Sequence, residues 1–259
     1  MDYTIAAIDR ALKLLEIVAE NQNIGLSELA RQTGTTKTLA FRMATTLEAR
    51  GYLLKDPEER TYSLGYKPLY LGEQMQHRSP LVRIANPVLD DLSARTRENI
   101  SLLVRDGLGT ICVAIRQSPQ PIRLYAELGR QGPLHVGGGP KLLLAFAPDD
   151  VQEKVLAGQL EAFTPSTIVD PKRLKALLKR IRAQGYNVSH GDLDPGAFSV
   201  AAPIRDHGGR VIASVSVAGP QSRLTRDLEQ LYIRILVEAA SEISTKLGWR
   251  ALADTEELV

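Results

Sequence analysis

Residues 25–66 constrain the fold of this chain more than any other segment, because their pattern is typical of a winged helix-turn-helix. The first predicted helix carries a short apolar stripe at Leu26, Leu29 and Ala30. Gly34 then interrupts the chain where two helices would have to turn sharply. A second helix is predicted by apolar residues spaced i, i + 3, i + 4 and i + 7, namely Ala40, Met43, Ala44 and Leu47.

A β-hairpin is predicted directly after this second helix. Residues 52–54 and 61–64 are β-prone, and the turn-forming residues 56–59 lie between them. Lys55 and Arg60 flank the tip, where a wing would follow the phosphates beside a DNA groove. The alternative is a helical hairpin and ribbon that only pack together. The hairpin at this distance after residues 50–52 favours DNA binding over that alternative.

The second helix is the candidate recognition helix, because polar residues are free at its N-terminal end. Thr35 or Thr36 is expected to cap it, and Ser27 is expected to cap the helix before it. Residues 1–66 hold eight basic and nine acidic residues, a formal charge of −1, so DNA affinity must come from local placement of basic groups. The predicted DNA-contacting residues are Ser27, Arg31, Thr36, Lys37, Thr38, Phe41, Arg42, Lys55 and Arg60.

Composition narrows the remaining classes of protein. The chain has 259 residues, 44% of them apolar, and a net charge of +2, which suits one or two globular domains. Its single cysteine, Cys112, excludes an intrachain disulfide and is expected in the core. Four scattered histidines predict no metal site, and no cofactor is expected. Residues 1–4 do not resemble a signal peptide, and without an 18-residue apolar run we expect a cytoplasmic protein with no membrane partner.

The pattern changes after residue 80, where helices flank a largely antiparallel set of strands. Helices are expected at 81–97, 140–147, 149–157, 171–184 and 225–247, and strands near 100–105, 110–116, 122–127, 186–190, 198–205 and 210–218. An amphipathic helix at 5–20 would bury Ile8, Leu12, Leu15 and Ala19. The fold class is therefore α+β. The predicted domains are 1–66 for DNA binding, a linker helix at 67–79, and 80–259.

Both halves of the chain together resemble the IclR family of bacterial transcription regulators. The blocks that carry the resemblance are 10–12, 26–30, 50–53, 62–65, 118–121, 132–135, 141–146, 182–186, 194–196, 201–204 and 214–220. The resemblance implies a GAF-like effector domain after the linker, with homodimers or homotetramers on palindromic double-stranded DNA operators. Leu39 departs from the pattern, since a small polar residue is usual there; it would contact a thymine methyl or pack.

An effector site is predicted where a glycine-rich turn runs into a helix. Residues 135–141 end in Pro140 and Lys141, with Pro140 expected at the first helical position, and free amides at a helix N-terminus attract a carboxylate. The period of two places Ser214 and Ser216 on one strand face, opposite the core residues 211, 213, 215 and 217. The family resemblance adds a small organic or aromatic acid as effector, and the predicted site is His135, Gly138, Gly139, Ser189, Ala197, Ser199, Ser214 and Ser216.

Three functions are considered for a chain with these residues. A ligand-responsive DNA-binding regulator is the leading prediction. An enzyme is not expected, because the chain has no Walker A sequence, nucleophile elbow or His-Glu-x-x-His motif and no catalytic residue stands out. A DNA-binding dimerisation protein with a vestigial or altered pocket is the alternative, since Pro140 replaces the glycine usual in the family and removes an amide donor.

Overall fold

The computed structural model describes residues 3–250, which form two compact units that meet between Arg78 and Ser79. Each unit has a hydrophobic core of its own. The predicted domains began at residue 1 and ended at residue 259, so residues 1–2 and 251–259 of those predictions lie outside the described residues.

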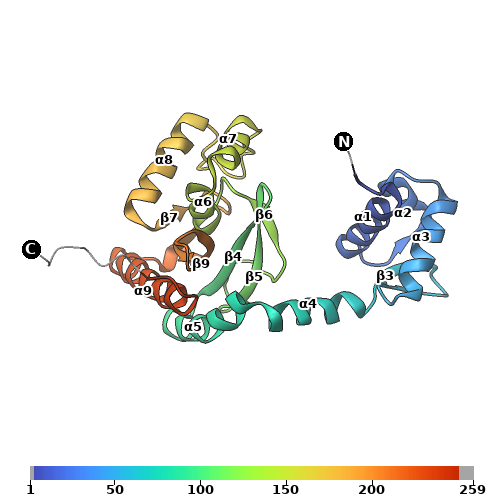
Figure 1. The fold of residues 1–259 in the computed structure, drawn as a ribbon, viewed down its shortest axis with the longest axis horizontal. Helices are drawn as coiled ribbons and strands as arrows, with labels where there is room; N and C mark the ends of the chain where they lie inside the picture. The colour runs from blue at the N-terminus through green and yellow to red at the C-terminus, as the bar shows by residue number, and fades with distance from the viewer. Residues whose placement is uncertain (1–2, 251–259) are drawn as a thin grey trace, which may run out of the picture. The chain divides into compact units, whose positions relative to one another are not determined.

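The first unit is a winged helix-turn-helix, as predicted (Figure 1). Gly34 makes the turn between its second and third helices with a φ of 67°, a left-handed value that favours glycine. The wing is an antiparallel sheet in the order β1-β3-β2. The elements are α1 (Ala6–Glu20), β1 (Ile24–Gly25), α2 (Leu26–Thr33), α3 (Lys37–Ala49), β2 (Leu53–Lys55), β3 (Thr61–Leu64) and α4 (Lys67–Arg78).

The core of this unit matches the prediction for α3 and corrects it for α1. Ala40, Met43 and Ala44 are buried, and Leu47 packs beside them as expected. In α1 the prediction of a buried face through Ile8 and Leu12 is wrong. Both are exposed, while Leu14, Ile17 and Val18 are buried, because these three face α2, α3 and the wing.

Helix capping is also partly as expected. The Thr36 hydroxyl accepts a hydrogen bond from the amide of Leu39 at 3.2 Å and so caps α3, as predicted. Ser27 does not cap α2, because that helix already begins at Leu26 with Gly25 at the cap position and no side-chain cap. Leu39 is half-buried against the core, so packing is its observed role in the structure.

The second unit contains a six-stranded, fully antiparallel sheet in the order β6-β5-β4-β9-β8-β7. This confirms the α+β prediction. The strands are β4 (Asn99–Asp106), β5 (Gly109–Arg116), β6 (Gln131–Pro133), β7 (Asn187–His190), β8 (Ala197–Arg205) and β9 (Val211–Pro220).

The strand predicted near residues 122–127 does not form. Residues 117–130 are an irregular connection, and β6 starts after it. Side chains take the backbone carbonyls that a neighbouring strand would need: Asn99 Nδ2 donates to the Leu124 oxygen at 2.9 Å, and Arg223 Nη1 donates to the Ile122 oxygen at 2.9 Å.

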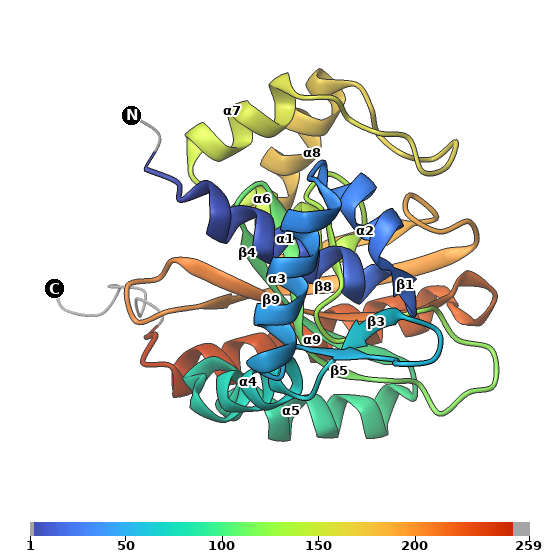
Figure 2. The same cartoon turned by 90° about the vertical axis from the view of Figure 1, so that its right-hand side faces the viewer.

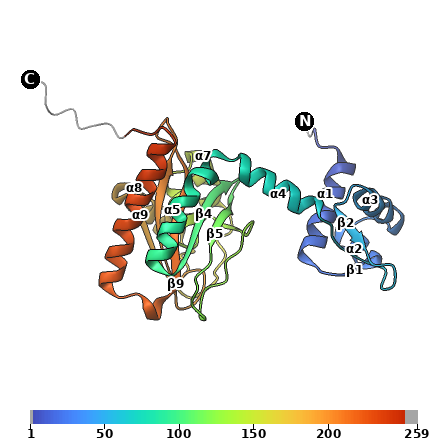
Figure 3. The same ribbon diagram turned by 90° about the horizontal axis from the view of Figure 1, so that it is seen from below.

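Helices cover both faces of this sheet, whose central strands are β4 and β9. Helices α5 (Pro80–Thr96) and α9 (Arg226–Lys246) pack side by side on one face (Figure 3). Helices α6 (Gly138–Ala145), α7 (Asp149–Ala157) and α8 (Pro171–Gln184) lie on the other (Figure 2). Ala213, Val215 and Val217 of β9 belong to the core under α5 and α9, as the alternation predicted. The prediction is wrong for Val211, which is half-buried and packs against the core on the opposite face, because the register shifts between Ile204 and Arg205.

No helix among residues 3–250 is long and apolar enough to span a membrane.

Candidate functional site

The outer face of α3 carries polar and basic side chains. Its buried face is held by Ala40, Met43 and Ala44, and this leaves Lys37, Thr38 and Arg42 exposed near the N-terminal end. All nine residues predicted to contact DNA are exposed in the structure: Ser27, Arg31, Thr36, Lys37, Thr38, Phe41, Arg42, Lys55 and Arg60. An exposed basic helix face of this kind has the shape and charge that the major groove accepts.

The wing is joined to α3 by one cation–π contact. The ammonium of Lys55, at the end of β2, lies 5.8 Å from the centroid of the Phe41 ring. Phe41 remains 46% exposed, so it is available to a partner as well as to Lys55. Arg60 sits at the tip of the wing with a φ of 55°, a value that non-glycine residues seldom adopt.

Arg31 has a competing partner inside the unit. Its guanidinium donates to both carboxylate oxygens of Glu28, through Nε at 2.8 Å and through Nη2. Those bonds, with one from Gln32, lower the pKa of Glu28 to about 2. Arg31 therefore has to leave Glu28, or share its charge with it, to reach a phosphate.

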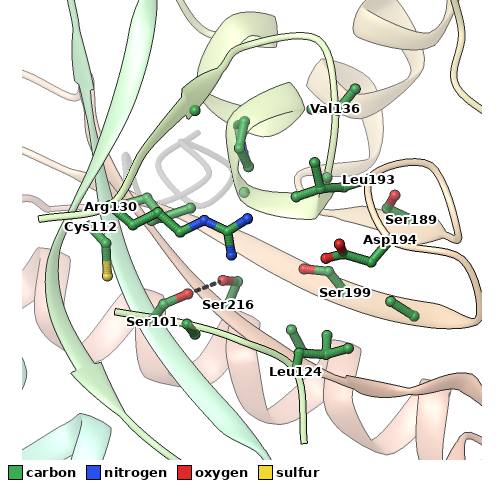
Figure 4. A pocket seen from close by; sticks show the side chains of 18 of the residues that line it. Ser101, Cys112, Leu124, Arg130, Val136, Ser189, Leu193, Asp194, Ser199 and Ser216 are labelled. Atoms are coloured by element: carbon green, nitrogen blue, oxygen red, sulfur yellow. Dashed lines mark hydrogen bonds between the residues drawn. The ribbon is translucent and has the colours of Figure 1, made fainter. Parts of the chain in front are cut away.

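A cavity of about 240 Å³ lies in the second unit beside the start of α6 (Figure 4). Five of the predicted effector-site residues line it: Gly139, Ser189, Ala197, Ser199 and Ser216. Most of the wall is apolar, with Leu103, Leu124 and Phe198 among its residues. A small, mostly apolar cavity with a few convergent polar groups is the usual form of a small-molecule site.

The glycine-rich turn brings the backbone to the cavity. Gly137 caps α6 with a φ of 80°, and Pro140 is the third residue of the helix, not the first as predicted. Its missing amide is among those that a helix start leaves unpaired in any case, so the proline does not weaken the helix. Within residues 3–250 the amides of Gly138 and Gly139 donate no hydrogen bond, and Gly139 faces the cavity.

A buried ion pair occupies the wall next to this turn. Lys141 and Asp192 have side chains only 5% and 8% exposed and pair with each other. Asp192 also accepts from the hydroxyl of Ser189 and from the amide of Gly137 at 3.1 Å. The amide of Gly137 is thus already bound to a carboxylate of the chain itself, which leaves the amide of Gly139 to face the cavity.

Close packing explains two of the glycines. A Cβ on Gly138 would lie 2.5 Å from the Ser199 hydroxyl oxygen. A Cβ on Gly139 would lie 2.7 Å from Leu103 Cδ1 and 2.9 Å from the Ser214 hydroxyl oxygen. Any side chain at either position would push into the cavity wall or the sheet beneath it.

Three predicted residues do not line the cavity. Gly138 lies behind it, where Asn187 Nδ2 donates to its carbonyl oxygen at 2.8 Å. His135 is buried, and its Nε2 is hydrogen-bonded to the Glu161 carbonyl oxygen at 2.8 Å. Ser214 is fully buried beneath Gly139, and among residues 3–250 its hydroxyl has no hydrogen-bond partner.

Several residues that line the cavity were not predicted from the sequence. The Ser101 hydroxyl forms a 2.8 Å hydrogen bond with Ser216, because β4 and β9 pair Ser101 directly with Ser216. Asp192, Asp194 and Arg130 come from loops whose course depends on the whole sheet. The strand-like pattern of 100–105 and 210–218 is the signal that would have indicated Ser101, once β4 was known to pair with β9.

Known proteins resemble the chain over both units. The family profile described as the bacterial transcriptional regulator IclR C-terminal domain matches residues 73–245, and the IclR helix-turn-helix domain matches residues 7–57. The HTH-type transcriptional regulator KipR of Bacillus subtilis is 32% identical over 241 residues, which covers 93% of this chain and 96% of KipR.

Solved structures agree with this match. The crystal structure of the Thermotoga maritima IclR has a TM-score of 0.76 and 30% identity, with 95% of this chain and 100% of that chain covered. An IclR homolog from Microbacterium hydrocarbonoxydans, complexed with 4-hydroxybenzoate, has a TM-score of 0.81 and 26% identity, with 93% and 98% covered.

Proposed function

The chain belongs to the IclR family of bacterial transcriptional regulators, and from that premise we propose that it binds operator DNA under the control of a small organic acid. The observation that carries the proposal is the cavity at the start of α6, in a chain whose other unit is a winged helix-turn-helix. Relatives of this chain are named as transcriptional regulators, and one homolog was crystallised with 4-hydroxybenzoate.

The DNA contact we propose is made by α3 and the wing. The N-terminal part of α3, with Lys37, Thr38 and Arg42, enters the major groove, and Lys55 and Arg60 follow the phosphates. A dimer or tetramer doubles these contacts on a palindromic operator, which compensates for the low net charge of +2.

The effector contact we propose lies at the inner wall of the cavity. A carboxylate accepts from the unpaired Gly139 amide and from hydroxyls that face the cavity, those of Ser199 and Ser216. Ligand binding changes DNA affinity through a difference in affinity between two arrangements of the dimer. Helix α4, which has no buried residue, is the segment through which we expect the signal to pass.

The proposed DNA binding is tested with double-stranded DNA fragments that the wild-type protein selects from a pool of random sequences. Arg42→Ala should weaken binding to these fragments in an anisotropy titration by a factor of about 5–150 if it loses a base contact of roughly 1–3 kcal/mol. Arg83→Ala, an exposed arginine on α5, is the control and should bind normally. Unchanged binding by the Arg42 variant would remove α3 from the proposed interface.

The effector half is tested by a thermal-shift screen of small carboxylic and aromatic acids, with 4-hydroxybenzoate included. At least one acid should raise the melting temperature and change binding to the selected DNA. Ser216→Ala should reduce the shift, because the variant loses a hydroxyl that lines the cavity. An acid that binds without any change in DNA affinity would favour a DNA-binding protein with a vestigial pocket.

A further inference from the structure

The charged side chains around the cavity differ in whether they have an ion-pair or hydrogen-bond partner. Four of the lining residues carry ionisable acidic or basic groups: Glu127, Arg130, Asp192 and Asp194. Asp192 is neutralised by Lys141 within the wall. Glu127 is hydrogen-bonded to the hydroxyl of Tyr125, a contact that raises the pKa of Tyr125. Glu127 keeps its charge but is exposed, whereas Arg130 and Asp194 face each other across the cavity (Figure 4).

Arg130 points into the cavity from the connection that leads to β6. Its Nη1 donates to the backbone oxygen of Tyr125 at 2.7 Å, and its guanidinium lies 5.2 Å from the centroid of the Tyr125 ring. These contacts hold the side chain over the cavity without neutralising its charge. Within residues 3–250 it forms no ion pair with a carboxylate, so most of its donors are free for a ligand.

Asp194 faces Arg130 from the opposite side. It lies on the loop between β7 and β8, and its carboxylate is directed toward the guanidinium across the cavity, with Ser199 beside it (Figure 4). Among residues 3–250 this carboxylate makes neither an ion pair nor a side-chain hydrogen bond; only the backbone oxygen of Asp194 is used, by the amide of Ala197 at 3.1 Å.

The guanidinium of Arg130 and the carboxylate of Asp194, on opposing walls, complement a ligand that carries both charges. A plain carboxylate would satisfy Arg130 but lie against Asp194, and a dicarboxylate would be repelled by it. A plain amine would satisfy Asp194 but would be repelled by Arg130. Since opposite charges a few ångströms apart attract and like charges repel, a zwitterion is the ligand class for which both contacts are favourable.

We propose that the effector is a small α-amino acid with an apolar side chain, with its carboxylate on Arg130 and its ammonium group on Asp194. The hydroxyl of Ser199, which lies beside Asp194 in the cavity wall, donates to the carboxylate. The apolar side chain packs on Leu103, Leu124 and Phe198, and the cavity of about 240 Å³ limits its size. This inference rests on the proposed effector role of the cavity and names the class of acid that fills it.

The inference is tested with the full-length protein and matched sets of compounds that differ in one charge. One set is leucine, 4-methylpentanoate and 3-methylbutylamine; another is phenylalanine, 3-phenylpropanoate and 2-phenylethylamine. A thermal-shift screen of the twenty standard amino acids comes first, and calorimetry follows on the hits. In at least one set the amino acid should bind about tenfold more tightly than either of its analogues.

Two variants separate the two charges. Asp194→Asn should weaken binding of the amino acid about tenfold, because the ammonium group loses its charged partner, and should leave binding of the deaminated acid equal or tighter, because the repulsion from Asp194 is gone. Arg130→Gln should weaken the binding of both the amino acid and the deaminated acid, because both carry the carboxylate. The controls are Arg123→Gln, an exposed arginine on the same connection that does not line the cavity, and Asp106→Asn on the exposed β4–β5 turn; both should bind as wild type.

The outcomes distinguish this inference from the proposed function. If plain acids bind more tightly than the amino acids and Asp194→Asn has no effect, the amino-acid inference is wrong while an acid effector still stands. If the acid and the amine of each set bind as tightly as the amino acid, the paired charges of the ligand contribute nothing and the inference is again wrong. If neither the acids nor the amino acids bind, the effector role itself fails.

Discussion

Replacing Asp192 with alanine should destabilise the second unit more than any exposed charge change, because it leaves the Lys141 ammonium buried without a counter-ion. The two side chains are 8% and 5% exposed, so water cannot replace the lost partner. Lys141 Nζ would keep only the Ser189 hydroxyl at 3.3 Å, and the amide of Gly137 would lose its acceptor. Removing one partner of such a buried pair costs about 3–5 kcal/mol of unfolding free energy.

A loss of this size is measurable by urea unfolding and by the melting temperature. Trp249 is the only tryptophan of the chain and belongs to the second unit, so its fluorescence reports the unfolding of that unit in urea. At about 2–4 °C per kcal/mol for a unit of this size, the melting temperature should fall by roughly 6–20 °C. Asp150→Ala is the matched control. It breaks the exposed Lys154–Asp150 pair, with side chains 63% and 65% exposed, and should lower the melting temperature far less, because water screens both charges.

A double variant separates the ion pair from simple loss of packing. Lys141→Met with Asp192→Ala removes both charges and should regain about 2 kcal/mol of the loss caused by Asp192→Ala alone. The reasoning is refuted if Asp192→Ala costs no more than Asp150→Ala. It is equally refuted if the double variant is less stable than Asp192→Ala, since the buried charge would then not be the source of the penalty.

Four further outcomes are expected. Glu28→Gln should tighten binding to selected DNA severalfold in an anisotropy titration, because it releases Arg31 and removes a negative charge; equal or weaker binding would contradict the role of Arg31. Burial raises the pKa of Cys112 to about 11, two units above 9.0, so a thiol reagent at pH 8 should label the folded chain about 100-fold more slowly than the urea-unfolded chain; rapid labelling of the folded protein would contradict this. Gly139→Ala should abolish effector-induced thermal shifts and lower stability by about 1–3 kcal/mol, since its Cβ would lie 2.7 Å from Leu103 Cδ1; a normal shift would place the ligand elsewhere. Two glycines inserted after Gly72 in α4 should preserve effector binding by calorimetry and abolish its influence on DNA binding; a variant that still responds would exclude signalling through α4.

Local patterns predicted the first unit well. The spacing of Ala40, Met43 and Ala44 is sufficient to orient α3, because a helix with one apolar stripe has only one way to face a core. The error in α1 has a physical cause. Ile8 and Leu12 are as apolar as Leu14 and Ile17, so periodicity alone offered two faces, and only packing against α2 and α3 selects one of them.

The candidate site was less predictable, because it is assembled from distant parts of the chain. Lys141 and Asp192 are 51 positions apart, and Ser101 and Ser216 are 115 apart. Neither pair leaves a local signature, since each depends on which strands lie next to each other in the sheet. Gly139 and Ser216 were predicted because a glycine-rich turn and an alternating strand are local patterns.

The alternation of β9 has a consequence for how such a chain changes over generations. Ala213, Val215 and Val217 face the core under α5 and α9, while Ser214 and Ser216 face the other side of the sheet. A substitution on the serine face of this strand leaves the side chains of its apolar face unchanged. Evolution can therefore vary the cavity wall at Ser216 while the side chains that pack under α5 and α9 stay the same.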